Sequence, residues 1–208
     1  MKTLAVFGDS WPAGVELQEN QKPFGDLLHE MLGTDKYYNM SCEGTAIDSM
    51  IMQLDNFIKN KSFEDCVSVF FITNPTRQLY FKNNKFKIYR PTGDKSSEAK
   101  FYFSEMQSDE IDEHKANTTI LALQRMCSKH NITDIYLEGW TKINFCYSGI
   151  DKRKIFEKSA IELFGADVNK RTAELSKYQS NEYIYPNKYH PNQKGHELIA
   201  ENLYNFIK

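Results

Sequence analysis

A run of seven residues, from Cys66 to Ile72, is apolar at every position except Ser68. Asn74-Pro75 follows shortly after the run, and a proline disfavours helical backbone at the residue before it. A strand that is apolar on both faces is typical of a parallel sheet covered by helices on both sides. The sequence therefore predicts a buried strand at residues 66–72.

Further strand candidates alternate with amphipathic helices along the chain. Strands are predicted at residues 4–7, 37–40, 66–72 and 134–138, and helices at 23–33, 45–59, 109–130, within 151–179 and at 192–207. This alternation indicates an α/β fold with a central parallel sheet and helices on both of its faces. A length of 208 residues fits a single domain, and we assign residues 1–208 to it.

One segment, at about residues 79–116, interrupts the alternation and is interpreted as an insertion. Its first part, 79–102, is rich in Lys, Asn, Tyr and Phe, and Asn83-Asn84 lies between two arms of alternating aromatic residues. This pattern predicts a β-hairpin. The insertion is either a surface excursion or a lid over a site, and its position directly after Asn74 favours the lid.

Charge and hydrophobicity exclude several functions. The 26 Lys and Arg residues nearly balance the 28 Asp and Glu residues, which argues against a nucleic-acid-binding protein. No apolar run approaches the ~18–20 residues that a membrane-spanning helix needs. The apolar run at the N-terminus is too short for a signal peptide, so we expect a cytoplasmic protein. Four cysteines without metal-ligand spacing predict free thiols and no metal site.

Polar groups follow each of the first three predicted strands: Gly8-Asp9-Ser10, then Gly44, then Asn74. Ligands of an open parallel sheet bind at the carboxyl ends of its strands. A hydroxyl, a glycine amide and an asparagine amide at that edge are the groups that acyl transfer needs, namely a nucleophile and donors for an oxyanion.

A serine nucleophile needs a base, and His190 is the best-placed of the five histidines. It lies with Pro191-Asn192 in the loop before the last predicted helix, and that loop returns to the same edge of the sheet. His196 falls inside the last helix and is interpreted as structural.

Taken together, Gly8-Asp9-Ser10, Gly44, Asn74 and His190-Pro191-Asn192 resemble the four sequence blocks of the SGNH (GDSL-like) hydrolase superfamily. The resemblance implies a flavodoxin-like three-layer α/β/α sandwich and hydrolysis of esters or thioesters, sometimes with acyl transfer, without metal or cofactor. It also implies Ser10 as nucleophile and His190 as base. The Ser10 amide, the Gly44 amide and the Asn74 side chain would form the oxyanion hole.

The chain departs from the family pattern at Asn187, where the family places an Asp three residues before the histidine. Asn can accept a hydrogen bond from the imidazole but supplies no charge, and the same change in a serine-protease triad costs on the order of 10⁴ in kcat. Three interpretations follow. The enzyme works as a Ser10–His190 dyad with Asn187 or a backbone carbonyl orienting the ring; another acid such as Glu138 replaces the Asp; or the chain has lost hydrolysis.

Two functions therefore remain. The first is a serine esterase or deacylase acting on a small acyl ester, such as an O-acetyl group on carbohydrate; an acyltransferase would use the same residues. The second is a non-catalytic protein that binds carbohydrate or a partner. Arg77 either faces the site to recognise an anionic substrate or is a solvated surface charge, and Ser10 has the alternative role of a helix N-cap.

Overall fold

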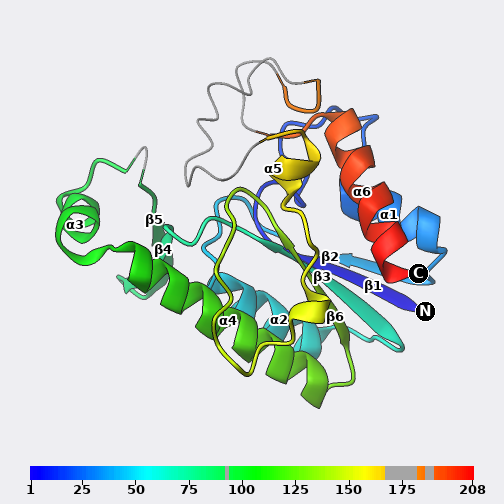
Figure 1. Cartoon of the computed structure of the whole chain (residues 1–208), viewed down its shortest axis with the longest axis horizontal. Helices are drawn as coiled ribbons and strands as arrows, with labels where there is room; N and C mark the ends of the chain where they lie inside the picture. The colour runs from blue at the N-terminus through cyan, green and yellow to red at the C-terminus, as the bar shows by residue number, and fades with distance from the viewer. Residues whose placement is uncertain (92–93, 167–181, 186–189) are drawn as a thin grey trace.

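The computed structural model describes residues 1–91, 94–166, 182–185 and 190–208, and its centre is a four-stranded parallel sheet (Figure 1). In spatial order the strands are β2 (Lys36–Asn39), β1 (Thr3–Phe7), β3 (Cys66–Ile72) and β6 (Thr133–Glu138). The chain leaves β1 toward β2 and then crosses to β3 on the other side, so the strand order reverses beside β1. That reversal is where open α/β sheets bind ligands.

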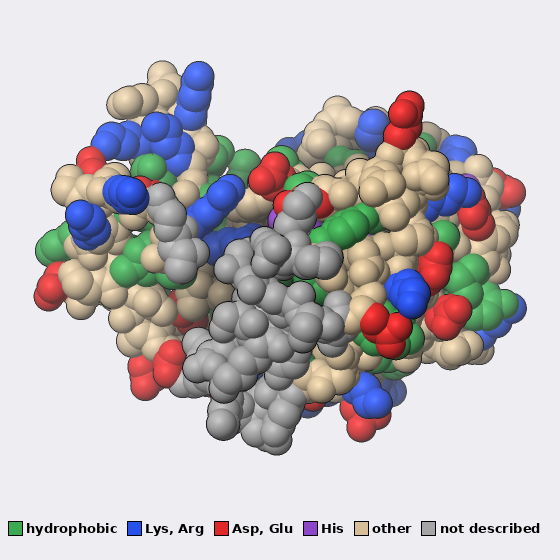
Figure 2. All heavy atoms as spheres, turned by 90° about the horizontal axis from the view of Figure 1, so that it is seen from above, with side chains coloured by type: hydrophobic (Ala, Val, Ile, Leu, Met, Phe, Trp, Pro, Cys, Tyr) green, Lys and Arg blue, Asp and Glu red, His purple; other side chains and the backbone are tan. Residues whose placement is uncertain are grey.

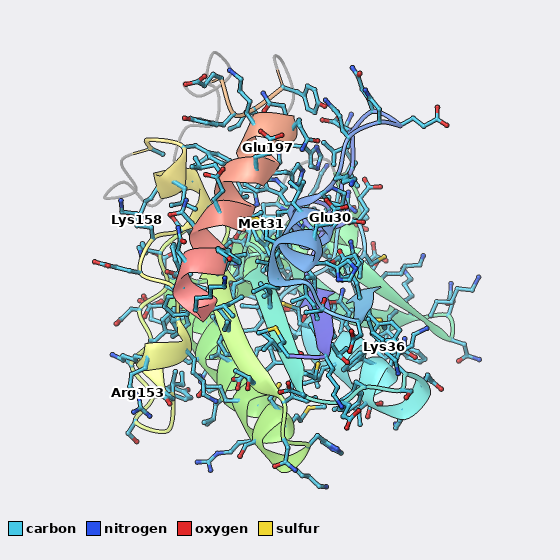
Figure 3. All side chains as sticks on the ribbon, turned by 90° about the vertical axis from the view of Figure 1, so that its right-hand side faces the viewer. Glu30, Met31, Lys36, Arg153, Lys158 and Glu197 are labelled. Atoms are coloured by element: carbon cyan, nitrogen blue, oxygen red, sulfur yellow. The ribbon has the colours of Figure 1, made fainter. Side chains whose placement is uncertain are left out.

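Successive residues of each buried strand point into two separate hydrophobic cores. Leu4 and Val6 contribute to one core, and Ala5 and Phe7 to the other. One face is covered by α1 (Phe24–Leu32), α5 (Ala160–Leu163) and α6 (Gln193–Ile207), and the other by α2 (Ser49–Asn60) and α4 (Asp109–Lys129). Figure 3 shows α1 and α6 side by side. The predicted three-layer α/β fold is therefore confirmed.

A two-stranded hairpin extends from the domain after β3. It is formed by β4 (Gln78–Lys82) and β5 (Lys85–Tyr89), which pair antiparallel. Asn83 and Asn84 connect them with φ angles of 54° and 58°, and Asn tolerates this left-handed backbone better than most residues. The hairpin that the sequence predicts is therefore present.

The excursion from the sheet ends earlier than residue 116. After α3 (Ser97–Phe101) and a π-helical turn η1 (Tyr102–Met106), Ser108 caps α4 by accepting a hydrogen bond from the Ile111 N–H. Residues 109–116 thus form the start of α4, and Ala116 is fully buried in the core against the sheet. The sequence analysis placed residues 109–116 both in the insertion and in the predicted helix 109–130, and the structure has them in the helix.

Several other boundaries differ from the predicted ones, most by a single residue. Helix α2 begins at Ser49 rather than at residue 45, and α6 begins at Gln193, with Asn192 as its N-cap. The predicted helices within 151–179 reduce to a 3-10 turn η2 (Lys152–Lys154) and to α5, while residues 167–179 lie outside the described residues. Among the helices in the described ranges, none has the length and apolar character needed to cross a membrane.

Candidate active site

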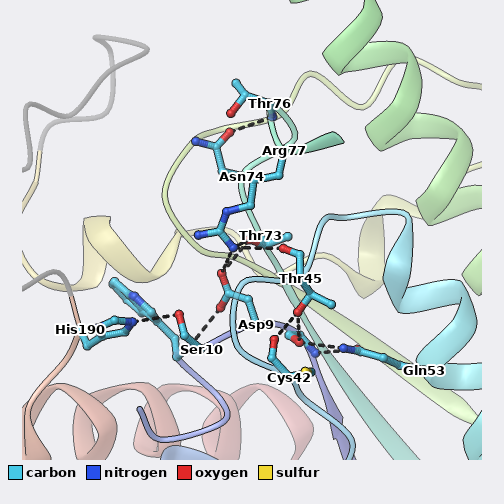
Figure 4. A network of polar contacts seen from close by, with 12 residues as sticks. Asp9, Ser10, Cys42, Thr45, Gln53, Thr73, Asn74, Thr76, Arg77 and His190 are labelled. Carbon is cyan, nitrogen blue, oxygen red and sulfur yellow. Dashed lines mark hydrogen bonds and ion pairs between the residues drawn. The ribbon is translucent and has the colours of Figure 1, made fainter. Parts of the chain in front are cut away.

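The turn after β1 is sharp and firmly held. Gly8 has a φ of 147°, and a Cβ at this position would lie 2.9 Å from the Phe71 carbonyl oxygen, so only glycine fits. The Gly8 carbonyl accepts hydrogen bonds from Thr45 Oγ1 and Gln53 Nε2, both at 2.9 Å. Gln53 also accepts from the Gly8 N–H at 3.0 Å. These contacts hold the start of the turn against the loop before α2 and against α2 itself (Figure 4).

The same turn presents Ser10 to His190. Ser10 Oγ lies 2.9 Å from His190 Nε2, although the two residues are 180 positions apart. The structure thus brings together the two side chains that the sequence analysis placed at one edge (Figure 4). No helix begins at Ser10, because residues 11–16 form turns, so the alternative role as a helix N-cap is wrong.

His190 is held by backbone contacts on both sides of it. The Tyr185 N–H donates to the His190 carbonyl at 3.2 Å, and the Asn192 N–H donates to the Tyr183 carbonyl at 2.9 Å. Asn192 also caps α6, because its side chain accepts from the Gly195 N–H at 3.2 Å. The histidine is therefore held between the backbone pairing of residues 183–185 with residues 190–192 and the start of α6.

A carboxylate that the sequence analysis missed lies behind the imidazole. Glu16 Oε2 is 3.0 Å from His190 Nδ1. The two groups are at ion-pair distance without the alignment of a linear hydrogen bond, as is common for catalytic contacts before a substrate binds. Glu16 sits in an irregular turn, so no periodicity or motif in the sequence marked it.

The other candidates for this role are not at the imidazole or cannot be placed. Glu138 Oε1 accepts from the Ile143 N–H at 2.5 Å, and its Oε2 is 3.4 Å from Lys142 Nζ. Burial raises the pKa of Glu138 to about 7, while the Ile143 N–H and Lys142 oppose this shift. The suggestion that Glu138 replaces the family Asp was therefore wrong. Asn187 lies outside the described residues.

Two backbone amides of the predicted oxyanion hole, those of Ser10 and Gly44, have no hydrogen-bond acceptor in the described part of the chain. Gly44 has a φ of 73°, as glycine permits. Asn74 Oδ1 accepts from the Thr76 N–H at 2.9 Å, which leaves its NH₂ group as a donor. The oxyanion-hole roles of Ser10, Gly44 and Asn74 stay predictions.

Asp9 and Arg77 form an ion pair that joins the three turns, with the carboxylate buried and the guanidinium partly exposed. Asp9 is fully buried, and its Oδ2 accepts from Thr73 Oγ1 at 2.6 Å and from Arg77 Nη1 at 2.9 Å. Its Oδ1 accepts from the Trp11 N–H at 3.1 Å. Arg77 Nη1 also donates to the Thr45 carbonyl at 3.0 Å. Arg77 therefore holds the turns together through these contacts (Figure 4). The sequence analysis interpreted it either as a residue that recognises substrate or as a solvated surface charge.

His196 has the structural role that the sequence analysis gave it. Its ring is fully buried, and its Nδ1 accepts a hydrogen bond from the Phe24 N–H at 3.1 Å. Burial, with a smaller contribution from His190, lowers the pKa of His196 to about 3. His196 therefore stays neutral and ties α6 to the start of α1.

A pocket of about 420 Å³ lies beside Gly44. The Arg90 guanidinium, from the end of the hairpin, occupies the space that a Cβ at residue 44 would need. The lining residues come from the loop before α2, from α2 and from the hairpin: Cys42, Glu43, Gly44, Thr45, Ser49, Met52, Gln53, Leu79, Phe86, Lys87, Ile88 and Arg90. Figure 2 shows Lys and Arg side chains gathered on the hairpin side of a hollow in this region.

The cysteines do not form a site. Cys66 and Cys127 are buried free thiols, and Cys42 and Cys146 are exposed free thiols. In the ranges that the structure describes, no three His, Cys, Asp or Glu side chains are grouped so that they could hold a metal ion.

No protein-family model matches the sequence, and no curated protein matches it significantly. Solved structures match it over almost its whole length. TesA has a TM-score of 0.56 at 15% identity, covering 100% of this chain and 98% of the other. A G-D-S-L family lipolytic protein from Veillonella parvula has a TM-score of 0.52 at 14% identity, and the match covers 99% of this chain and 97% of the other. The acetyl xylan esterase AlAXEase has a TM-score of 0.51 at 16% identity, and the match covers 99% of this chain and 100% of the other. The chain therefore has the fold of the SGNH, or GDSL-like, hydrolase superfamily.

Proposed function

We propose that the protein is a serine esterase or deacylase that cleaves a small acyl ester. The observation that carries this proposal is the 2.9 Å contact between Ser10 Oγ and His190 Nε2, because a hydroxyl this close to an imidazole nitrogen can lose its proton as it attacks. The fold shared with esterases and lipolytic proteins supports the same reaction class.

In the proposed reaction, Ser10 Oγ attacks the ester carbonyl carbon while His190 Nε2 takes the hydroxyl proton. The oxyanion of the tetrahedral intermediate would accept hydrogen bonds from the N–H groups of Ser10 and Gly44 and from the Asn74 side chain. Collapse of the intermediate breaks the carbon–oxygen bond to the alcohol, which takes the proton from the imidazolium. Water then attacks the acyl-serine with His190 as base, releasing the acid and restoring the serine; an acceptor alcohol in place of water would give acyl transfer.

Labelling with a fluorophosphonate tests the nucleophile. We expect one phosphonyl group to attach to Ser10, located by peptide mass spectrometry, because only an activated serine displaces the fluoride quickly. His190→Ala should slow the labelling strongly, whereas Ser128→Ala, at an exposed position on α4, should leave it unchanged. A folded protein that takes up no label at Ser10 would contradict the esterase proposal.

The second candidate function is a non-catalytic carbohydrate- or partner-binding protein, and Asn187 is the observation that favours it. One structural neighbour, a carbohydrate esterase, is described as having divergent catalytic and non-catalytic binding functions. It has a TM-score of 0.52 at 10% identity, and the match covers 64% of its chain. Under this alternative Ser10→Ala would leave both ester turnover and carbohydrate binding as they are in the wild type.

For the substrate, we propose an acyl ester on an acidic carbohydrate. An acetyl xylan esterase among the structural neighbours supports an acetylated carbohydrate. The pocket beside Gly44 supports the acidic group, because Lys87 and Arg90 line it and Glu43 is the single acidic residue of the lining. Neither cation forms an ion pair with another residue of the described chain.

Arg90→Gln is therefore expected to raise KM for an O-acetylated galacturonan about ten- to hundredfold, the effect of losing one hydrogen bond between charged groups. KM for an O-acetylated xylan, which carries no acid at the acetylated sugar, should stay within about twofold because that bond is never made. Acetate release measures both. Lys85→Gln, at the exposed tip of the hairpin, is the matched control. Equal effects of Arg90→Gln on both polymers would contradict recognition of the acid.

A further inference from the structure

We infer that Glu16 positions the catalytic histidine in place of the aspartate that the SGNH pattern puts at residue 187. The inference rests on the proposed function in one respect only, namely that His190 is the base. Its first support is distance: Glu16 Oε2 lies 3.0 Å from His190 Nδ1, on the opposite side of the ring from the 2.9 Å contact with Ser10. Both atoms at the carboxylate contact are buried.

The second support is that the loop carrying Glu16 is tied to the segments on both sides of His190. Tyr185 Oη donates to Gln21 Oε1 at 2.5 Å, ahead of the histidine in sequence. Beyond it, Gln193 Oε1 accepts from the Lys22 N–H at 2.9 Å. The carboxylate is therefore held against the imidazole by the fold, and its position does not depend on Glu16 alone.

The third support is the backbone of Glu16, which has a φ of 75°. A residue with a side chain is rare in this left-handed region and costs about 1 kcal/mol or more there, whereas glycine adopts it freely. A glutamate at this point is thus unfavourable for the turn itself. Strained positions of this kind cluster at active sites, and here the strained residue is the one whose carboxylate reaches the imidazole.

A carboxylate at Nδ1 does two things for the reaction. It holds the proton on Nδ1, which leaves the Nε2 lone pair free to accept the Ser10 proton. It also stabilises the imidazolium that forms while the tetrahedral intermediate exists. A neutral Asn187 can do neither by charge, so the chain keeps a complete Ser10–His190–Glu16 arrangement with the acid supplied from a different loop.

Kinetics of three variants test this role. Glu16→Gln keeps size and backbone strain but removes the charge, and should lower kcat for p-nitrophenyl acetate on the order of 10²–10⁴ with KM nearly unchanged. Glu16→Gly relieves the backbone strain and should be equally slow, but added formate should restore part of the rate by entering the vacated space. Glu19→Gln, exposed on the same loop, is the control and should match the wild type.

A measurement that needs no turnover separates this inference from the proposed function. In ¹⁵N NMR of histidine-labelled protein, the neutral His190 ring of the wild type should carry its proton on Nδ1. In Glu16→Gly the two tautomers should mix, and formate should restore the first. If the wild type neither cleaves esters nor labels at Ser10 but shows this tautomer response, the proposed function fails and the positioning role stands.

The inference is overturned by full activity of Glu16→Gln, or by a slow Glu16→Gly variant that formate does not accelerate and whose tautomer does not change. Asn187→Asp supplies the converse test. If Glu16 already serves His190, a second carboxylate should change kcat by less than about threefold, whereas a gain approaching the 10⁴ that a lost triad Asp costs would show that the acid was missing.

Discussion

Ser10→Ala is expected to lower kcat for p-nitrophenyl acetate on the order of 10⁶, the effect of removing the nucleophile of a serine triad while its oxyanion donors remain. The physical reason is that the covalent route disappears. His190 Nε2, which lies 2.9 Å from Ser10 Oγ, would then have only water to deprotonate, and attack by water forms no acyl-enzyme.

The loss should occur without unfolding. Ser10 Oγ makes its described contact with His190 alone, so thermal melting of Ser10→Ala should stay close to that of the wild type. Ser128→Ala again serves as the matched substitution and should keep full activity. Equal rates of ester cleavage by Ser10→Ala and the wild type would remove the esterase proposal and leave the binding alternative.

Arg77→Met is expected to cost about 3–5 kcal/mol of the free energy of unfolding, the usual effect of removing the partner of a buried charge. Methionine keeps most of the apolar stem but, among the described residues, leaves the fully buried Asp9 carboxylate with Thr73 and Trp11 as its donors. The Thr45 carbonyl loses a donor as well. Urea unfolding followed by circular dichroism measures the change.

A double-mutant cycle with Asp9→Asn identifies the cause of that loss. The double variant should be less destabilised than the sum of the two single variants, because Asn without Arg leaves no buried charge. Arg125→Met, at an exposed position of α4, should change stability by no more than about 0.5 kcal/mol. Additive single effects would show that the ion pair does not join the three turns energetically.

The strands of the sheet and the residues Ser10 and His190 could be predicted because each is marked by a short, continuous pattern in the sequence. The buried strand at Cys66–Ile72 is continuous in sequence, Asn83-Asn84 marks a tight turn, and Ser10 and His190 each belong to a short motif. The rule that parallel strands present their carboxyl ends at one edge then brings the motifs together.

The rest of the site depends on tertiary contacts that leave no local pattern. Glu16 is an ordinary charged residue in an irregular turn, and only the folded chain shows it beside His190. Arg77 looks like a surface charge in the sequence, because its partner Asp9 is 68 positions away. Residues 109–116 fell in both the predicted insertion and the predicted helix 109–130, and the burial of Ala116 against the sheet, which ties them to α4, appears only in the folded chain.

The pairing of α1 with α6, sealed by the His196–Phe24 hydrogen bond, has a consequence for biosynthesis. The proposed nucleophile, Ser10, leaves the ribosome 180 residues before its proposed base, His190. A chain translated only as far as α5 therefore holds Ser10 without its partner, and the Ser10–His190 contact can form only once α6 is made and docks onto α1.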